Sequence, residues 1–404
     1  MKRFLLTLSL GLVALLAISQ AVPPSPPAGW AGPTATERSA FGTPLIALET
    51  IDQNLGFPYL LNSEVVATST GDAGTVVSSP PFAVLTGNAA GGFGELHSRR
   101  NTRYLPGQGI SVRFTAISTA CTGQTSEAGI GDGTDFLGFG CCPSCGPGGT
   151  PSWAYLRRSN GVNNYVAQAS WNQTTVPWLD ITKLNVYQVA FQWLGAGQIT
   201  AFVEHQDTGE YVAVHNDKYT NRNTDTSFRN PSLPLRVFVV GNGQLKVPSM
   251  GVLRQGFNPP IGLAVSTANT RATSSAAEIP ILTIQNRATF GGITNRVAIE
   301  PTILGVSAGN SDTTINVYKN SVADGGTFTD IDTNTSVTSA NPGPSQRYGG
   351  RLVWSFVQQN ATATPYNLTD LNLHLVPGDT LMITAQSASG TPNTVVSVGW
   401  KELQ

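Results

Sequence analysis

Hydrophobic and polar positions alternate with a period of two from residue 185 to 215, NVYQVAFQWLGAGQITAFVEHQDTGEYVAVH. The apolar positions are Tyr187, Val189, Phe191, Trp193, Ile199, Ala201 and Val203. Gly195-Ala196-Gly197 interrupts the alternation, and Asp207-Thr208-Gly209 supplies a second turn whose glycine favours positive φ. The pattern predicts an antiparallel meander of three strands. Because a period of two buries one face, the meander needs a second sheet to cover it.

Short apolar segments separated by turn residues recur along the rest of the chain, which favours strands over helices. They include Leu45 to Leu48, Phe82 to Leu85, Ile110 to Ala116, Ser152 to Arg158 and Leu235 to Val240. Beyond the N-terminal segment, no stretch keeps a helical period over ten or more residues. We therefore expect an all-β protein with two antiparallel, jelly-roll-like β-sandwich domains in tandem.

The domain boundaries follow from length and from a shift in composition. A chain of 404 residues exceeds what a single core usually supports. A polar stretch with NPP and TSSAA predicts a linker at 259–280, between a first sandwich at 37–258 and a second at 281–404. About seven strands are expected in the second sandwich.

The N-terminus has the layout of a secretory signal peptide over residues 1–21. Lys2 and Arg3 precede an apolar run from Phe4 to Ile18, and small residues follow, with cleavage expected after Ala21. The alternative is a retained anchor, but this run is shorter than the roughly 17 to 25 residues that a span needs. Residues 22–36, VPPSPPAGWAGPTAT, predict an extended Pro-rich leader. The mature protein is expected to be secreted, with no membrane span.

Composition narrows the class of partner. Charged residues make up 12% of the chain, about half the usual share, and the net charge is −1. Nucleic acid and anionic lipid both require concentrated positive charge, so neither is expected as a partner.

Four cysteines, Cys121, Cys141, Cys142 and Cys145, suggest two disulfides in an exported chain, with three connectivities open. A four-cysteine zinc site is the alternative, but Cys121 has no neighbouring cysteine to form the usual C-x-x-C pair. The Gly-rich run that follows predicts a loop at a sheet edge, which the bridges would stiffen.

Two residues are candidates for ligand binding. Trp153 lies on a predicted strand and offers a ring for sugar stacking, and Arg157 offers hydrogen bonds to hydroxyls. Trp171 and Trp178 are further aromatic candidates. Core packing is the alternative, because a β-sandwich of this size buries several aromatic side chains.

The sequence predicts no catalytic residues. Gly305-Val306-Ser307-Ala308-Gly309 matches the G-x-S-x-G pattern of a nucleophile elbow, but no helix follows, so a loop is expected. No strand carries the Glu-x-Asp or Glu-x-Glu pair of a glycosidase. We expect a non-enzymatic protein.

No cofactor is expected, with calcium as the alternative at two acidic stretches. Asp330 to Asn334 has the first ligand positions of a calcium loop, and Asp132 and Asp135 lie in a Gly-rich turn. Asx turns account for both stretches without a metal.

Several strings resemble a family of tailed-phage virion structural proteins. They are SRRNTRYLPGQGISVRFTA, GIGDGTDFLGFG, the meander at 185–215, FTDIDTNTSV, NLTDLNLHLVPGDTLMITA and VGWKEL. The resemblance implies a concanavalin- or laminin-G-like jelly roll followed by a second β-sandwich. It also implies a virion-associated or phage-derived structural or adhesion role on a virion surface, through self-association or contacts with other virion or surface proteins. It brings no catalytic residues. The alternative is a secreted carbohydrate-binding protein that uses the laminin-G-like domain and has glycans as partners.

Overall fold

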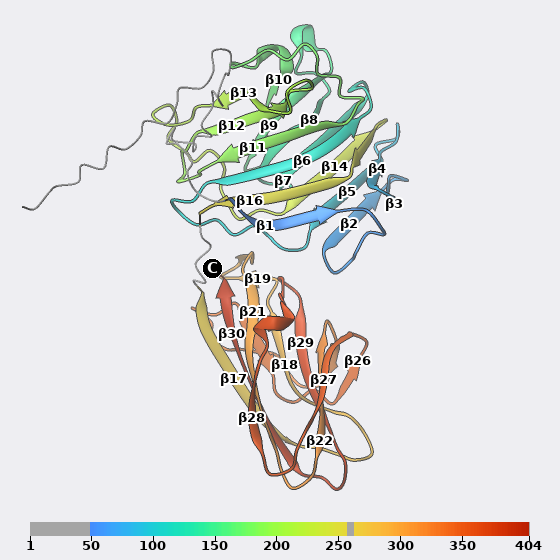
Figure 1. Cartoon of the computed structure of the whole chain (residues 1–404), viewed down its shortest axis with the longest axis vertical. Coiled ribbons are helices and arrows are strands. Elements are labelled where there is room, and N and C mark those ends of the chain that lie inside the picture. Colours follow the sequence, from blue (N-terminus) through green and yellow to red (C-terminus); the bar gives the residue numbers. More distant parts are fainter. Residues whose placement is uncertain (1–48, 257–261, 404) are drawn as a thin grey trace, which may run out of the picture. The chain divides into compact units, whose positions relative to one another are not determined.

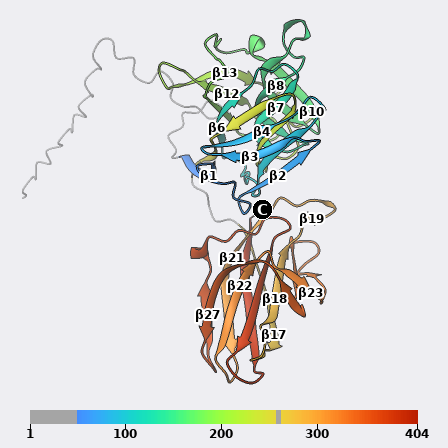
Figure 2. The same cartoon turned by 90° about the vertical axis from the view of Figure 1, so that its right-hand side faces the viewer.

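The computed structural model describes residues 49–256 and 262–403, and almost all of its regular structure is β-strand, which confirms the all-β expectation (Figures 1 and 2). The predicted signal peptide at 1–21, the leader at 22–36 and residues 37–48 lie outside the described residues. Short 3₁₀ turns are the remaining regular elements: η1 (Pro147–Gly149), η2 (Gln168–Ser170) and η3 (Thr369–Leu371). In the described part of the chain, no helix has the length and hydrophobicity to cross a membrane.

Two antiparallel sheets form the first sandwich. Sheet I has nine strands: β13 (Tyr211–Asp217), β12 (Ile199–Glu204), β11 (Asn185–Phe191), β6 (Ile110–Ser118), β15 (Gln244–Val247), β4 (Phe82–Thr86) and β3 (Thr75–Ser79), with β16 (Ser249–Gln255) paired to β6 and β1 (Glu49–Gly56) paired to β16. Sheet II has seven strands: β10 (Val162–Ala167), β9 (Ser152–Ser159), β8 (Phe136–Cys142), β7 (Gln124–Gly131), β14 (Leu235–Gly241), β5 (Phe93–Ser98) and β2 (Val66–Gly71).

The second sandwich also has two main sheets. Sheet III has four strands: β17 (Leu263–Ala272), β30 (Asn393–Leu403), β21 (Ala298–Ala308) and β28 (Ala363–Asn367). Sheet IV has six: β24 (Thr329–Asp330), β25 (Thr338–Asn341), β18 (Ile279–Asn286), β29 (Thr380–Ser387), β22 (Thr313–Lys319) and β27 (Arg351–Gln358). Two small hairpins pair β19 (Thr289–Phe290) with β20 (Ile293–Thr294), and β23 (Val322–Asp324) with β26 (Gln346–Tyr348).

The structure confirms the predicted meander as β11, β12 and β13, which are neighbours in sheet I. Gly209 has a φ of 70°, as the second turn requires. Trp193 differs from the prediction, because β11 ends at Phe191 and Trp193 follows the strand, with its ring packed against the core. Its Nε1 donates a hydrogen bond of 3.0 Å to the carbonyl oxygen of Phe228.

Two predictions about local structure were wrong. The linker predicted at 259–280 is largely strand, because β17 pairs with β30 from Leu263 to Ala272. Its polar residues alternate along an edge strand of sheet III, so they resemble a linker in composition. Likewise, Ser307 lies inside strand β21 and not in a loop.

Aromatic side chains from both sheets fill the core of the first sandwich, so sheet II is the cover that the meander needs. Phe139 of sheet II lies 5.0 Å from Tyr187 of sheet I, between ring centroids, and Phe114 stacks on Tyr187 at 5.3 Å. All three side chains are buried. The second sandwich has a separate core that includes Trp400, Ile281 and Val306.

The outer face of sheet II carries an ion network around Glu127, which is 1% exposed. Its carboxylate accepts hydrogen bonds from both Arg158 and Arg236. Arg236 Nε also donates to Glu95 at 2.7 Å, and Arg158 Nε donates to Asn163 Oδ1 at 2.7 Å. A buried carboxylate between two guanidinium groups matters because the loss of one partner leaves charge uncompensated away from water.

We expect Glu127→Gln to lower the free energy of unfolding by about 3 to 5 kcal/mol, because two buried arginines lose their shared counter-ion. Urea denaturation followed by tryptophan fluorescence measures this change. Glu95→Gln is the matched control: Glu95 is the more exposed partner of Arg236, and we expect a cost of no more than about 1 kcal/mol. Equal costs for the two variants would contradict the central role of Glu127.

Candidate functional site

The outer face of sheet I is a candidate site because of the alternation along its strands. On β11, Tyr187 and Val189 point into the core, so Gln188 between them points outward. On β6, Phe114 is in the core and Arg113 points outward in the same way. Arg113 and Gln188 are also direct neighbours in the pairing of the two strands.

Arg113 is the centre of a group of four side chains, Glu49, Arg113, Gln188 and Tyr211, which we call the Arg113 cluster. Arg113 Nε donates to Gln188 Oε1 at 2.6 Å, and its Nη2 donates to Glu49 Oε2 at 2.8 Å. The guanidinium carbon lies 5.3 Å from the centroid of the Tyr211 ring, which is within cation–π range. The four residues come from β6, β1, β11 and β13.

A glycine lies directly beside Arg113 on the neighbouring strand β16. β16 lies between β6 and β1, as Figure 1 shows, and Gly251 of β16 is the direct pairing partner of Arg113. Glu49 pairs with Gln255 of β16, four positions from Gly251, so the arginine reaches this carboxylate along the sheet and not straight across the glycine. A Cβ at this position would meet only the carbonyl oxygen of Gln53, at 3.6 Å, so the backbone itself does not require glycine.

The cluster is electrically balanced and partly open to solvent. Glu49 neutralises Arg113, and the arginine side chain keeps 28% of its exposure. A partly exposed ion pair contributes modestly to stability, roughly 0 to 1 kcal/mol. Its hydrogen bonds nevertheless fix the orientation of a carboxylate, a guanidinium group and an amide, next to the Tyr211 ring.

The structure places the two predicted ligand-binding residues inside the first sandwich. Trp153 is 3% exposed, and its ring lies 5.5 Å from that of Tyr187. Arg157 Nε donates to Asp217 at 2.7 Å, and its Nη1 donates to the carbonyl oxygen of Ser227 at 2.8 Å. Their binding roles stay untested predictions. A ring held between two sheets has no open face for a sugar, so Trp153 fits the alternative of core packing.

The other two aromatic candidates are Trp171 and Trp178. Trp171 is buried, and its Nε1 donates to the carbonyl oxygen of Val166 at 3.0 Å. Trp178 is half-buried, and its ring lies 5.0 Å from that of His205. Neither belongs to the Arg113 cluster.

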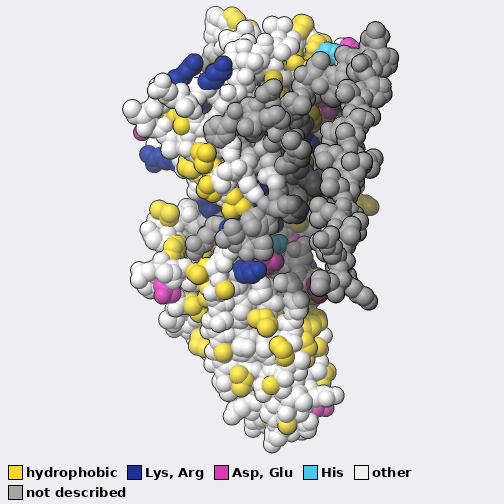
Figure 3. Space-filling view, turned by 60° about the vertical axis from the view of Figure 1, so that its left-hand side comes forward, with side chains coloured by type: hydrophobic (Ala, Val, Ile, Leu, Met, Phe, Trp, Pro, Cys, Tyr) yellow, Lys and Arg dark blue, Asp and Glu magenta, His cyan; other side chains and the backbone are white. Residues whose placement is uncertain are grey.

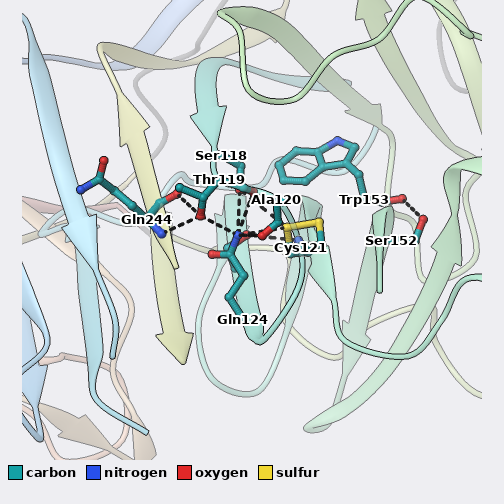
Figure 4. The surroundings of a disulfide bond; sticks show 10 residues. Ser118, Thr119, Ala120, Cys121, Gln124, Ser152, Trp153 and Gln244 are labelled. Atoms are coloured by element: carbon teal, nitrogen blue, oxygen red, sulfur yellow. Dashed lines mark hydrogen bonds between the residues drawn. A yellow bond between two sulfur atoms is a disulfide. The ribbon is translucent and has the colours of Figure 1, made fainter. Parts of the chain in front are cut away.

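The cysteines differ from the prediction of two bridges. Cys121 and Cys141 form one disulfide (Figure 4). Cys142 and Cys145 are free thiols. The bridge is also not at an exposed tip, because Cys141 belongs to strand β8 and both of its sulfurs lie in the core. Gln124 Nε2 supports the turn beside the bridge by donating to the carbonyl oxygens of Thr119 and Ala120, each at 2.9 Å.

Both acidic stretches form Asx turns, as the sequence suggested. Asp132 Oδ1 accepts from the backbone amide of Thr134 at 2.7 Å. Asp332 Oδ1 accepts from the amides of Asn334 and Thr335, at 2.8 and 2.9 Å, and these bonds lower the pKa of Asp332. Among the described residues, no group of three or more His, Cys, Asp or Glu is arranged to hold a metal ion. Calcium binding stays an untested alternative.

Sequence reasoning missed the Arg113 cluster. Two signals were visible: Arg113 is the one charged residue in the strand ISVRFTAIS, and Gln188 interrupts the apolar run VYQVAF. The pairing that joins them to Glu49 and Tyr211 depends on strand order, which sequence does not reveal.

Comparisons with known proteins find no matching family model and no matching curated protein. Among solved structures, the carbohydrate recognition domain of Emp47p is 12% identical with a TM-score of 0.35, over 52% of this chain and 97% of that domain. The VIP36 exoplasmic/lumenal domain, bound to Ca²⁺ and Man3GlcNAc, is 14% identical with a TM-score of 0.34, over 52% of this chain and 93% of that one. A mutant of the GH43 protein BlXynB from Bacillus licheniformis is 7% identical with a TM-score of 0.32, over 50% and 39%.

At TM-scores this low, these likenesses carry no argument about the function of this chain. The comparisons also do not show the phage virion family that the sequence resembled. The functional conclusion therefore depends on the side chains of this protein.

A pH dependence of stability follows from His215, which is 7% exposed and lies 5.2 Å from the Tyr155 ring, between ring centroids. Burial lowers the pKa of His215 below its ordinary 6.5, although Asp217 acts in the opposite direction. The unfolded chain therefore binds more protons than the folded chain at pH values just below 6.5. Stability from this residue is complete above that pH and falls as the pH decreases.

The free energy of unfolding is expected to decrease between about pH 7 and pH 5, and we expect this decrease to be smaller in His215→Gln. The difference should be about 1.4 kcal/mol for each pH unit by which folding lowers the pKa of His215. Urea denaturation across this range measures the slope. Burial also lowers the pKa of His97, which is present in both proteins. The pH dependence that remains in the variant therefore includes the contribution of His97. An identical slope in the parent protein and the His215 variant would contradict the assignment.

Proposed function

We propose that this protein binds carbohydrate and that the Arg113 cluster is its binding site. The single observation that carries the proposal is the cluster itself: a carboxylate, a guanidinium group and an aromatic ring are held together on a partly exposed sheet face, above the buried amide of Gln188. Sugar hydroxyls both donate and accept hydrogen bonds, and planar polar groups of these kinds suit them. The Tyr211 ring adds an apolar surface for the C–H face of a sugar ring.

The low charge of the surface supports a neutral ligand. Only 12% of residues are charged, and the face in Figure 3 is mostly neutral, with scattered single hydrophobic side chains. Within the cluster, Arg113 is already neutralised by Glu49, so an anionic ligand would have to compete with that carboxylate. A neutral glycan needs no such exchange.

The proposed activity is binding without catalysis. Glycoside hydrolysis in its usual form needs two carboxyl groups about 5 to 9.5 Å apart. The Arg113 cluster contains a single carboxylate, Glu49, and that group is engaged by Arg113. The predicted signal peptide and the observed disulfide support a location outside the cell, where glycans are exposed.

A glycan array screened with the mature chain, with calcium and with a chelator, tests the proposal. For a glycan that binds, we expect Arg113→Ala and Tyr211→Ala each to weaken the affinity about 10- to 100-fold in calorimetry, because each removes a direct contact worth about 1.4 to 2.7 kcal/mol. Tyr59→Ala is the matched control, since Tyr59 is an exposed tyrosine outside the cluster. We expect it to leave the affinity unchanged.

Melting temperatures of the three variants must stay close to that of the parent protein for this comparison to hold. Absence of any bound glycan at high protein concentration, with and without calcium, would contradict carbohydrate binding. Binding that survives both cluster variants would contradict the site.

A further inference from the structure

Two thiols stand apart from the proposed sugar site. Cys142 and Cys145 are reduced, and they flank Pro143 and Ser144 in a C-x-x-C spacing. This spacing brings two sulfurs close together in one turn of chain and is a recurrent arrangement for thiol–disulfide chemistry. The other two cysteines already form the core bridge.

The strand geometry separates the four cysteines into two pairs. Cys141 and Cys142 are consecutive residues of β8, so their side chains point to opposite faces of sheet II. Cys141 points into the core, where it is bonded to Cys121. Cys142 therefore lies on the outer face, and the sheet separates its sulfur from the core bridge.

Cys145 is the partner that remains on that outer face. Cys145 follows Cys142 by three residues, and the Cys142 thiol contributes to the raised pKa of Cys145, so the two side chains are close to each other. Tyr165 of β10 lies beside them, and both cysteines influence its pKa. Cys142 is buried and Cys145 is partly exposed, so a reagent from solution reaches Cys145 first.

We propose that Cys142 and Cys145 are a thiol–disulfide site, which closes into a second bridge on the outer face of sheet II. The oxidant is a disulfide, either a small molecule such as oxidised glutathione or the active-site disulfide of an oxidoreductase. The thiolate of one cysteine attacks this disulfide, forms a mixed disulfide and releases one thiol of the oxidant. The second cysteine loses its proton, attacks the first sulfur and releases the other thiol, so two protein thiols are oxidised and one disulfide is reduced.

Closure is slow near neutral pH because the attacking species is a thiolate. Burial, together with the neighbouring Cys142, raises the pKa of the Cys145 thiol to about 12. At pH values below the pKa, the thiolate fraction of such a group increases about tenfold for each unit by which the pH is raised. The uncatalysed rate of closure therefore increases steeply with pH.

The second bridge would fix the loop that follows β8. This loop contains η1, and it is held by a hydrogen bond of 2.8 Å from the Gly146 amide to the carbonyl oxygen of Thr150. Thr150 Oγ1 donates to the carbonyl oxygen of Pro147 at 3.0 Å. A bridge at Cys145 anchors one end of this small network to a strand of the sheet.

The test counts free thiols by alkylation under denaturing conditions and intact-mass spectrometry. The folded protein is first treated with a mild reductant that leaves the buried core bridge intact, and then with oxidised glutathione. We expect two labels before oxidation and none after it, with no glutathione attached. We also expect closure to accelerate about tenfold per pH unit between pH 7 and pH 9. Hydrogen exchange at the amides of Gly146 and Gly149, which donate hydrogen bonds within the loop, should be slower after closure.

Cys145→Ser and Cys142→Ser are the matched controls. Each should keep one sulfur outside the core bridge, found either as an alkylated thiol or as a mixed disulfide with glutathione. The proposal is overturned if the parent protein keeps two labels or carries glutathione at both sites. It is equally overturned if either variant has no free thiol and no glutathione, since the remaining cysteine would then pair with Cys121 or Cys141. If a variant fails to fold, the label count and exchange rates of the parent protein decide the question alone.

Discussion

Adjacent side chains of a strand point to opposite faces of a sheet, and most of the chemistry in this molecule follows from that constraint. Phe114 fills the core of the first sandwich, while Arg113 before it organises the outer face of sheet I. Cys141 belongs to a buried disulfide, while Cys142 after it is a thiol on the other side of sheet II. In each pair, one residue lies in the core and its neighbour lies on the outer face of the sheet.

Both outer faces of the first sandwich carry arginine–carboxylate ion pairs, but the pairs differ in how far they are buried. On sheet II, Glu127 is enclosed by two arginines, and its network is buried enough that its main effect is on folding. On sheet I, Arg113 is paired with Glu49 but keeps contact with solvent. Ion pairs of comparable chemistry therefore differ in role because burial decides whether their remaining hydrogen-bonding capacity is available to a ligand.

Sequence periodicity predicted the strands better than it predicted their order. The meander at 185–215 was found correctly because three strands, two turns and a positive-φ glycine all lie within one local stretch. The strand β17 was missed because its small polar residues, on a sheet edge, lack the apolar alternation that marks a buried face. Trp153 was predicted to bind a ligand because tryptophan rings can stack on sugars. The position of its side chain between the sheets depends instead on which face of β9 is covered.

The Arg113 cluster could not be predicted from local sequence patterns, for a further reason. Glu49 and Arg113 are distant in sequence, and they meet because β1 and β6 belong to the same sheet, with β16 between them. Nothing in the residues around either side chain indicates this strand order. Patterns that repeat within one strand are therefore readable from sequence, and contacts across three strands are not.

The bare position at Gly251 has a consequence for how this surface can vary. Because a Cβ there would touch only one carbonyl oxygen at ordinary contact distance, the backbone tolerates other residues. A larger residue would stand directly beside Arg113 on the outer face of sheet I and change the shape of the surface next to the guanidinium group. Substitution at this single position can therefore alter the outer face of sheet I while the sandwich beneath stays the same.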